Sequence, residues 1–403
     1  MPPKVEVWLN KEPPVFESNE YLYPNRIQIL FSLALLGLAA CGDSSVTDEP
    51  EQIAPVEEQE PLAYTPDVMG AWQVGVTELT GVGPDGEDSS LLVWYPSQAD
   101  DGTSYSYLGA FASGAKELST PDCSEMRKMV VYSHGNGGLN MQAPFLTEYL
   151  ASHGYVVVGV NHLENNVLNM VDEALPRVMF RRPIEVSMAF DSAVAQLGQT
   201  GGLLAGCIDE ADGFGVVGHS FGGYTSLVVA GASIDPVVTQ EMCDLGYSWL
   251  CNGVAQWESE NPGSVFTWND ERVWATAPMA PCGFEALAGG LQDITVPTLV
   301  LGGGMDTTCN IEYQIEAIYS KLKTPMRYMG VLPEGGHQAF SSVCEFGLDY
   351  RDCAPPYGDR EMLHNRVRST VLSFFGSARG DKRYNPWLNG VAGEMEWTQP
   401  TAE

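Results

Sequence analysis

A serine between glycines is the first group in this sequence that suggests chemistry. Gly218, His219, Ser220, Phe221 and Gly222 form the pattern G-x-S-x-G, which follows an apolar run and precedes a helix-forming one. On a tight turn from strand to helix, such a serine presents its hydroxyl at the edge of a sheet, and the glycines leave room for close backbone packing. We therefore predict that Ser220 is a nucleophile.

A serine hydroxyl attacks well only when a base removes its proton, and that base needs an acid to orient it. His337 lies on a glycine-rich loop after the last strand-like run, from which it can reach the serine. For the acid, Asp306 ends a strand-like run and lies 31 residues before His337. Glu285, on the preceding loop, is the alternative, whereas Asp293 comes before its strand and falls at the opposite edge of the sheet. We predict the set Ser220, Asp306 and His337.

This chemistry also needs hydrogen-bond donors for the oxyanion that forms during attack. Residues 133–138, with the sequence SHGNGG, follow a strand-like run, and a helix is expected to begin at Phe221. We expect the backbone N–H groups of Asn136 and Phe221 to be the donors. The sequence has no G-x-x-x-x-G-K-[ST] motif and no G-x-G-x-x-G after the first parallel strand, so we predict no nucleotide cofactor.

These residues need a scaffold that brings loops to one edge of a sheet. From Ala71 onward, short β-branched runs alternate with helical patterns, which is typical of an α/β sheet with crossover helices. Residues 72–80 and 91–95 predict an antiparallel hairpin at its start. The expected parallel strands are residues 129–133, 155–160, 215–218, 273–277, 298–301 and 326–331, and the expected helices are residues 145–152, 183–197, 221–231, 311–322 and 363–375.

The stretch 233–272 interrupts this alternation and holds Trp249, Trp257 and Trp268. Two interpretations stay open. It is either a lid or wall over the substrate, or a surface excursion whose tryptophans fill a small core of their own. As a lid, its aromatic side chains would favour an apolar substrate.

Together these motifs resemble the α/β-hydrolase superfamily over residues 71–378. The segments HGNGG (134–138), GHSFGG (218–223) and GHQAF (336–340) are similar to the group that contains platelet-activating-factor acetylhydrolases and bacterial predicted dienelactone hydrolases. The resemblance implies a mostly parallel sheet with an N-terminal antiparallel hairpin, helices on both faces and a lid-like insertion after the nucleophile helix. It also implies hydrolysis of a lipid-like or short-to-medium acyl ester through an acyl-enzyme, without a metal.

The sequence departs from both of these groups. After the sixth strand, where the acetylhydrolases carry their acid, it reads Met279-Ala280-Pro281-Cys282 and holds no Asp, so the acid moves to Asp306. Dienelactone hydrolases carry a cysteine where Ser220 stands. Asp306-Thr307 and the spacing to His337 are similar to bacterial cutinases and polyester hydrolases.

The first 41 residues predict an export signal with a lipid attachment site. The apolar run of residues 27–40 has 14 residues, fewer than the about 20 that a membrane-spanning helix needs. It ends in Leu38-Ala39-Ala40-Cys41-Gly42, which resembles the lipobox of bacterial lipoproteins and implies acyl chains on Cys41. An incidental cysteine in a buried hydrophobic hairpin is the alternative. Residues 1–26 are longer and more acidic than the start of such a signal, which a misassigned start codon would explain.

An acidic tether is expected at residues 42–70. From Gly42 to Asp67 there are eight acidic residues and no Lys or Arg, a composition typical of disordered, solvated chain. We expect this tether to hold an exported domain at the bacterial envelope, and at the outer membrane if there is one, because Gly42 rather than Asp follows the cysteine. Residues 379–403 are expected to form a C-terminal tail.

The other eight cysteines are an even number in a chain that we expect to be exported, which predicts disulfides. Zinc is the alternative, but no CxxC pair or His-x-x-x-His spacing supports it, so we predict no metal. Spacing alone leaves the connectivity open. With the fold that the resemblance implies, the expected pairs are Cys123–Cys207, Cys243–Cys251, Cys282–Cys309 and Cys344–Cys353.

Charge and motifs also limit the partners. The net charge of −32 argues against nucleic-acid binding, which depends on Lys and Arg at phosphates. The expected partners are a small-molecule or lipid ester and a membrane reached through Cys41, and no protein partner is inferred. Two rival functions remain open: an anchored binding lipoprotein with an inactive hydrolase fold, and an acyltransferase that uses the same three residues.

Overall fold

The computed structural model describes residues 66–388, except 209 and 245–249, and residues 396–398. The described residues belong to one compact unit. The predicted export signal, Cys41 and nearly all of the acidic tether lie outside the described residues. Within the part that is described, no helix combines the length and the apolar character that a membrane crossing requires.

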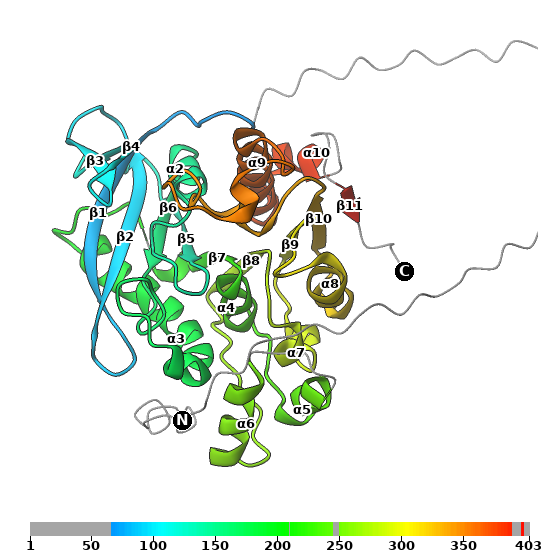
Figure 1. Ribbon diagram of the computed structural model, residues 1–403. Coiled ribbons are helices and arrows are strands. Elements are labelled where there is room, and N and C mark those ends of the chain that lie inside the picture. The colour runs from blue at the N-terminus through cyan, green and yellow to red at the C-terminus, as the bar shows by residue number, and fades with distance from the viewer. Residues whose placement is uncertain (1–65, 209, 245–249, 389–395, 399–403) are drawn as a thin grey trace, which may run out of the picture. The chain divides into compact units, whose positions relative to one another are not determined.

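A mixed β-sheet forms the centre of the fold (Figure 1). Among the described residues its strand order is β11-β10-β9-β8-β7-β5-β6-β2-β1-β4-β3. Strands β5 to β10 pair in parallel, and β1 and β2 form an antiparallel hairpin that joins them through β6. The strands are β1 Gln73–Val82, β2 Asp88–Ser97, β3 Thr103–Tyr107, β4 Phe111–Glu117, β5 Lys128–Ser133, β6 Tyr155–Val160, β7 Phe214–His219, β8 Val273–Met279, β9 Thr298–Gly303, β10 Arg327–Leu332 and β11 Glu396–Thr398. The predicted α/β class and its antiparallel start are confirmed.

Helices cover the sheet on both faces, with α3 and α4 on one side and α2 and α9 on the other (Figure 1). Alternate residues of one strand point to opposite faces, so Met129 and Val131 of β5 pack toward α3 and α4, whereas Val130 and Tyr132 pack toward α2 and α9. Strands buried on both faces read as continuous apolar runs. The helices are α2 Pro144–Ser152, α3 Leu175–Ala193, α4 Phe221–Val229, α5 Pro236–Asp244, α6 Cys251–Glu260, α7 Phe284–Leu287, α8 Glu316–Lys321, α9 Arg360–Ala378 and α10 Asn385–Leu388.

Several elements differ from the sequence-based expectation. Strands β3 and β4 extend the sheet beyond β1, although their small and polar residues gave no strand pattern. Helix α3 begins at Leu175 rather than at Pro183, which lies inside the helix. Tertiary packing outweighs the helix-breaking tendency of proline there, because most of the helix is buried.

The compact unit also extends beyond the predicted boundary at Ala378. Tyr384 and Leu388 are buried in the core that includes α9, and β11 pairs with β10. Part of the predicted tail is therefore a packed element of the fold.

The four disulfides have the connectivity that the resemblance implied, so this expectation is confirmed. One of them joins the loop after β8 to the loop after β9, and another lies within the segment that follows β10. The bonds join Cys123 to Cys207, Cys243 to Cys251, Cys282 to Cys309 and Cys344 to Cys353.

Phe190 provides a test of how α3 is held on the sheet. Its ring stacks on that of Phe214 in β7 with 4.7 Å between centroids, and both side chains are fully buried. Phe190→Ala is expected to lower the free energy of unfolding by about 3–5 kcal/mol, the usual cost of a cavity of this size. Urea denaturation with the disulfides intact measures it. The exposed control Val237→Ala on α5 should change stability by less than about 0.5 kcal/mol, and an equal loss in both variants would contradict this packing.

Candidate active site

Ser220 lies on the turn between β7 and α4. Its φ of 58° is in the left-handed region, which non-glycine residues rarely adopt, and its N–H donates to the Met279 carbonyl at 2.9 Å. A Cβ at Gly222 would collide with the main-chain carbonyl of Ser133, and a Cβ at Gly218 with the carbonyl of Gly222. The two glycines of the motif therefore let the backbone turn sharply against the end of β5.

Asp306 and His337 form a hydrogen-bonded pair after β9 and β10. His337 Nδ1 and Asp306 Oδ2 are 2.8 Å apart. The other Asp306 oxygen accepts from the amides of Thr308, at 2.7 Å, and Cys309, at 2.9 Å. Burial raises the pKa of Asp306, but its hydrogen bond to His337, the charge of that histidine and the two amides outweigh burial, so the net pKa lies below the ordinary value. Asp306 is therefore ionised at neutral pH, as an acid that orients a histidine must be.

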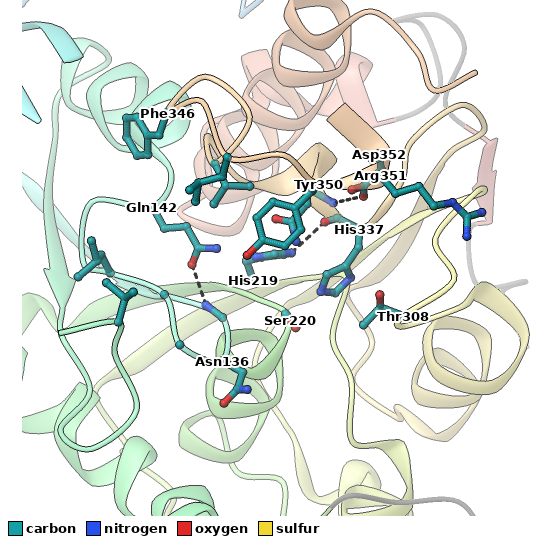
Figure 2. A pocket seen from close by; sticks show the side chains of 18 of the residues that line it. Asn136, Gln142, His219, Ser220, Thr308, His337, Phe346, Tyr350, Arg351 and Asp352 are labelled. Atoms are coloured by element: carbon teal, nitrogen blue, oxygen red, sulfur yellow. Dashed lines mark hydrogen bonds between the residues drawn. The ribbon is translucent and has the colours of Figure 1, made fainter. Parts of the chain in front are cut away.

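Ser220 and His337 line one cavity of about 580 Å³. Figure 2 shows Ser220 at its base, with His337 on one side and the loop of Asn136 on the other. Ser220 is partly exposed to this cavity, whereas His337 is only 9% exposed and Asp306 5%. Ser220 and His337 thus face one space that a small molecule can occupy, and Asp306 is joined to this space through its hydrogen bond to His337.

His219 holds the backbone of His337 in place. Its Nε2 donates to the His337 carbonyl at 2.9 Å, and the two rings lie 4.7 Å apart. Burial, with a smaller contribution from the charge of His337, lowers the pKa of His219 to about 3. His219 therefore stays neutral around pH 7 and acts here as a hydrogen-bond donor.

The two predicted oxyanion donors lie beside Ser220. Asn136 lines the cavity on the loop after β5, and its side-chain oxygen accepts from Asn165 at 2.7 Å. The amide of Gly135 donates to Gln142 Oε1 at 3.0 Å. Phe221 is the first residue of α4, where amides point out of the helix end and the helix dipole is positive.

The alternative acids lie elsewhere. Glu285, in α7, accepts from Gln314 at 2.9 Å, and burial raises its pKa. Asp293 accepts from Ser233 at 2.7 Å, in the segment before β9. Of these acids, Asp306 is the one that the structure bonds to His337.

A second group of a serine, a histidine and an acid lies next to this site and is completely buried. Ser133 Oγ and His162 Nε2 are 2.8 Å apart, and His162 Nδ1 and Glu185 are 2.7 Å apart. Each of the three side chains is at most 2% exposed. No substrate reaches this group, so its spacing is structural.

The cavity wall was not identified from the sequence. Residues after His337, among them Phe346, Leu348 and Tyr350, line it, and Cys344–Cys353 closes their loop. The Asp352 carboxylate accepts from the Gln338 amide at 2.6 Å and so ties this loop to the residue after His337 (Figure 2). The closely spaced cysteines after His337 were the signal that could have indicated it.

The interpretation of residues 233–272 as a lid is not supported by the structure. None of its described residues lines the cavity. Trp257 instead packs on Phe180 and Phe266, with ring centroids 5.0 and 5.2 Å away. Trp268 donates to Ser187 of α3. Neither interpretation holds in full for these two tryptophans, because they pack against α3 in the core on that face of the sheet. Trp249 lies outside the described residues.

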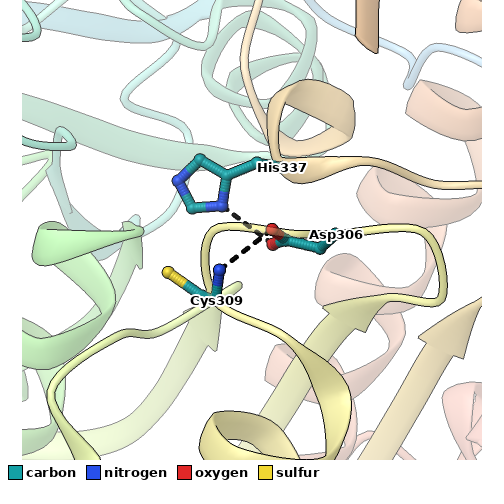
Figure 3. A group of neighbouring side chains, drawn as sticks. All are labelled: Asp306, Cys309 and His337. Atoms are coloured by element: carbon teal, nitrogen blue, oxygen red, sulfur yellow. Dashed lines mark hydrogen bonds and ion pairs between the residues drawn. The ribbon is translucent and has the colours of Figure 1, made fainter. Parts of the chain in front are cut away.

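Asp306, Cys309 and His337 also have the donor types of a metal site (Figure 3). Their candidate ligand atoms lie within 4.8 Å of one another. However, Cys309 is bonded to Cys282 and so offers no thiolate, and His337 Nδ1 is bonded to Asp306. This donor set fits a hydrogen-bonded acid–histidine pair better than a metal centre.

Comparison with known proteins gives no family for this chain, because no family model and no curated protein matches it.

The acid can be tested without knowing the substrate. A fluorophosphonate reacts with a serine that a histidine activates, so the rate at which it labels Ser220 measures that activation. Asp306→Asn is expected to slow labelling by roughly 10³- to 10⁴-fold, because the histidine loses its orienting charge and tautomer. Glu285→Gln, at the competing position, is expected to keep the native rate within about threefold. The reverse ranking, measured by mass spectrometry, would assign the acid to Glu285.

Proposed function

We propose that the protein is a serine carboxylic ester hydrolase that acts through an acyl-enzyme. The observation that carries the proposal is that Ser220 and His337 line one accessible cavity, with His337 hydrogen-bonded to Asp306. The order serine, acid, histidine along the chain is that of α/β-hydrolases. The parallel strands β5 to β10, with the three residues in loops after β7, β9 and β10, support placing the chain in that superfamily.

The proposed reaction begins when Ser220 Oγ attacks the ester carbonyl and passes its proton to His337 Nε2. The carbonyl oxygen becomes an oxyanion, which the amides of Asn136 and Phe221 stabilise, while Asp306 accepts from His337 Nδ1–H. The C–O bond to the alcohol then breaks, and His337 gives its proton to the leaving oxygen. Water repeats the sequence on the acyl-enzyme and releases the acid, which returns Ser220 and His337 to their starting states.

The wall of the cavity supports an apolar acyl or alcohol group. Leu108 is 54% exposed, Val167 62% and Leu348 50%, and all three line the cavity. Phe346 and Val343 continue this surface toward the interior. Burying such apolar surface contributes about 25 cal/mol per Å², so an ester with an aliphatic chain gains binding energy here. The resemblances of the sequence to acetylhydrolases and to cutinases are both compatible with such a substrate.

We further propose that the protein works outside the cytoplasm, anchored to the bacterial envelope by acyl chains on Cys41. Four disulfides support an oxidising compartment, because cytosolic proteins rarely keep them.

Hydrolysis of p-nitrophenyl acetate, butyrate and laurate by a soluble form that starts near Tyr64 tests the activity. We expect turnover with the native protein and a loss of at least about 10³-fold with Ser220→Ala, since the nucleophile is gone. Adding an alcohol or amine acceptor separates hydrolysis from acyl transfer. A folded, oxidised protein that hydrolyses no ester and takes no fluorophosphonate would instead favour a binding lipoprotein.

The apolar rim predicts chain-length preference. Leu108→Ser and Leu348→Ser are expected to lower kcat/KM for laurate by about 5- to 20-fold each, with little change for acetate, because the lost apolar contact is worth roughly 1–2 kcal/mol. Val237→Ser, exposed on α5 and not lining the cavity, is the control. A uniform loss on all three esters would mean that these side chains do not contact the acyl chain.

A further inference from the structure

Arg182, in α3, is a buried cation with an unusual set of partners. Its side chain is wholly buried. Its guanidinium donates to the carbonyl of His134 and the side chains of Ser133, Asn165 and Thr225, all of them neutral acceptors. A buried charge is costly unless its hydrogen bonds are satisfied, so the surrounding residues must be arranged around it.

These partners lie on the segments that carry the two predicted oxyanion donors. Asn165, which accepts from Arg182, donates to the side-chain oxygen of Asn136 at 2.7 Å. The guanidinium also lies over the ring of Phe221, 4.5 Å from its centroid, and bonds to Thr225 in the next turn of α4 at 3.0 Å. One side chain therefore contacts both sides of the predicted oxyanion hole.

The peptide between His134 and Gly135 is held at both of its ends. The carbonyl of His134 accepts from Arg182, and the N–H of the same peptide, at Gly135, donates to Gln142. A peptide is planar, so fixing its oxygen and its nitrogen fixes its orientation. The next peptide carries the Asn136 N–H, and its Gly135 carbonyl accepts from His134 Nδ1 at 2.6 Å and from the Gly138 amide at 3.1 Å. With the Asn136 side chain also bonded to Asn165, the chain on both sides of this N–H is held.

We propose that Arg182 is a positioning residue for the oxyanion hole, in that it orients the amides of Asn136 and Phe221 without touching the substrate. This inference rests on the proposed esterase function. It predicts that loss of Arg182 weakens the transition state far more than the bound substrate, because a hydrogen-bond donor aimed at the oxyanion acts mainly there.

Arg181 is the matched control. It is the preceding residue of α3 and also buried, but it pairs with carboxylates, among them Glu87, Glu164 and Glu185. Among the described residues, its hydrogen bonds and ion pairs involve neither the loop 134–138 nor α4. A general loss of buried charge in α3 affects both variants, whereas a role in the oxyanion hole affects Arg182 alone.

The experiment compares Arg182→Met, Arg182→Lys and Arg181→Met in the full-length protein. Each is assayed for kcat and KM on p-nitrophenyl butyrate and for inhibition by an alkyl trifluoromethyl ketone, which forms a tetrahedral oxyanion on the serine. For Arg182→Met we expect kcat and inhibitor affinity to fall together by about 10²-fold, with KM within about threefold of native. Arg182→Lys, which keeps the charge but not the fork of donors, should recover only part of the loss. Arg181→Met should keep native inhibitor affinity.

Asn165→Ala removes the link between Arg182 and the Asn136 side chain but keeps Arg182 itself. This variant decides the test if Arg182→Met does not fold, as judged by circular dichroism. It should lower inhibitor affinity by about 10-fold. The inference is overturned if the folded Arg182 variants keep native inhibitor affinity. If those variants do not fold, native inhibitor affinity in Asn165→Ala overturns it. An equal loss of inhibitor affinity in Arg181→Met also overturns it. If the native protein shows no hydrolysis that depends on Ser220, the proposed function itself fails. If the native protein and Arg182→Met are both fully active, the function stands and only the inference about Arg182 fails.

Discussion

Close packing of main chain at the end of β7 is the constraint on which the candidate site depends. At Gly218 and Gly222 the chain passes so near the carbonyls of Gly222 and Ser133 that no side chain fits. This approach places the first turn of α4 against the end of β5, and it leaves Ser220 in a left-handed conformation. Close contact between main-chain segments therefore brings together the proposed nucleophile and both predicted oxyanion donors.

The proposed acid and base are also held largely through main-chain groups. Asp306 receives two main-chain amides, and the amide donor Cys309 is tied by its disulfide to Cys282, in the loop after β8. His337 is held through its carbonyl by His219, the residue before the nucleophile. Because these contacts involve main chain and a disulfide, the geometry depends little on mobile surface side chains. Such preorganisation is what electrostatic catalysis requires, since dipoles already in place need no rearrangement during the reaction.

The sequence predicted the parts that depend on local pattern. The parallel strands follow from continuous apolar runs, and the positions of Ser220, Asp306 and His337 follow from loops at strand ends. The wall of the cavity did not follow, because Leu108 and Leu348 come from short, irregular segments whose placement is decided by distant packing and a disulfide. Trp257 and Trp268 gave a misleading signal, since aromatic residues pack into the core as readily as they cover a substrate. Arg182 had no sequence signal, because a buried arginine looks like any helix residue until its partners are placed.

The group Ser133–His162–Glu185 shows that the spacing of a serine, a histidine and an acid does not by itself make a reactive site. Its hydrogen-bond distances are those expected between a nucleophile, a base and an acid. However, burial, and next the charge of Arg182, lower the pKa of His162 well below its ordinary value. A histidine that resists protonation is a poor base for the serine proton, and none of these three residues lines the cavity on which Ser220 opens. Ser220 differs because it opens on a cavity, and because His337 is bonded to the ionised carboxylate of Asp306, which would stabilise an imidazolium in the proposed reaction. Arg182, whose charge adds to the effect of burial on His162, also contacts the loop beside Ser220, so one buried cation acts on both groups.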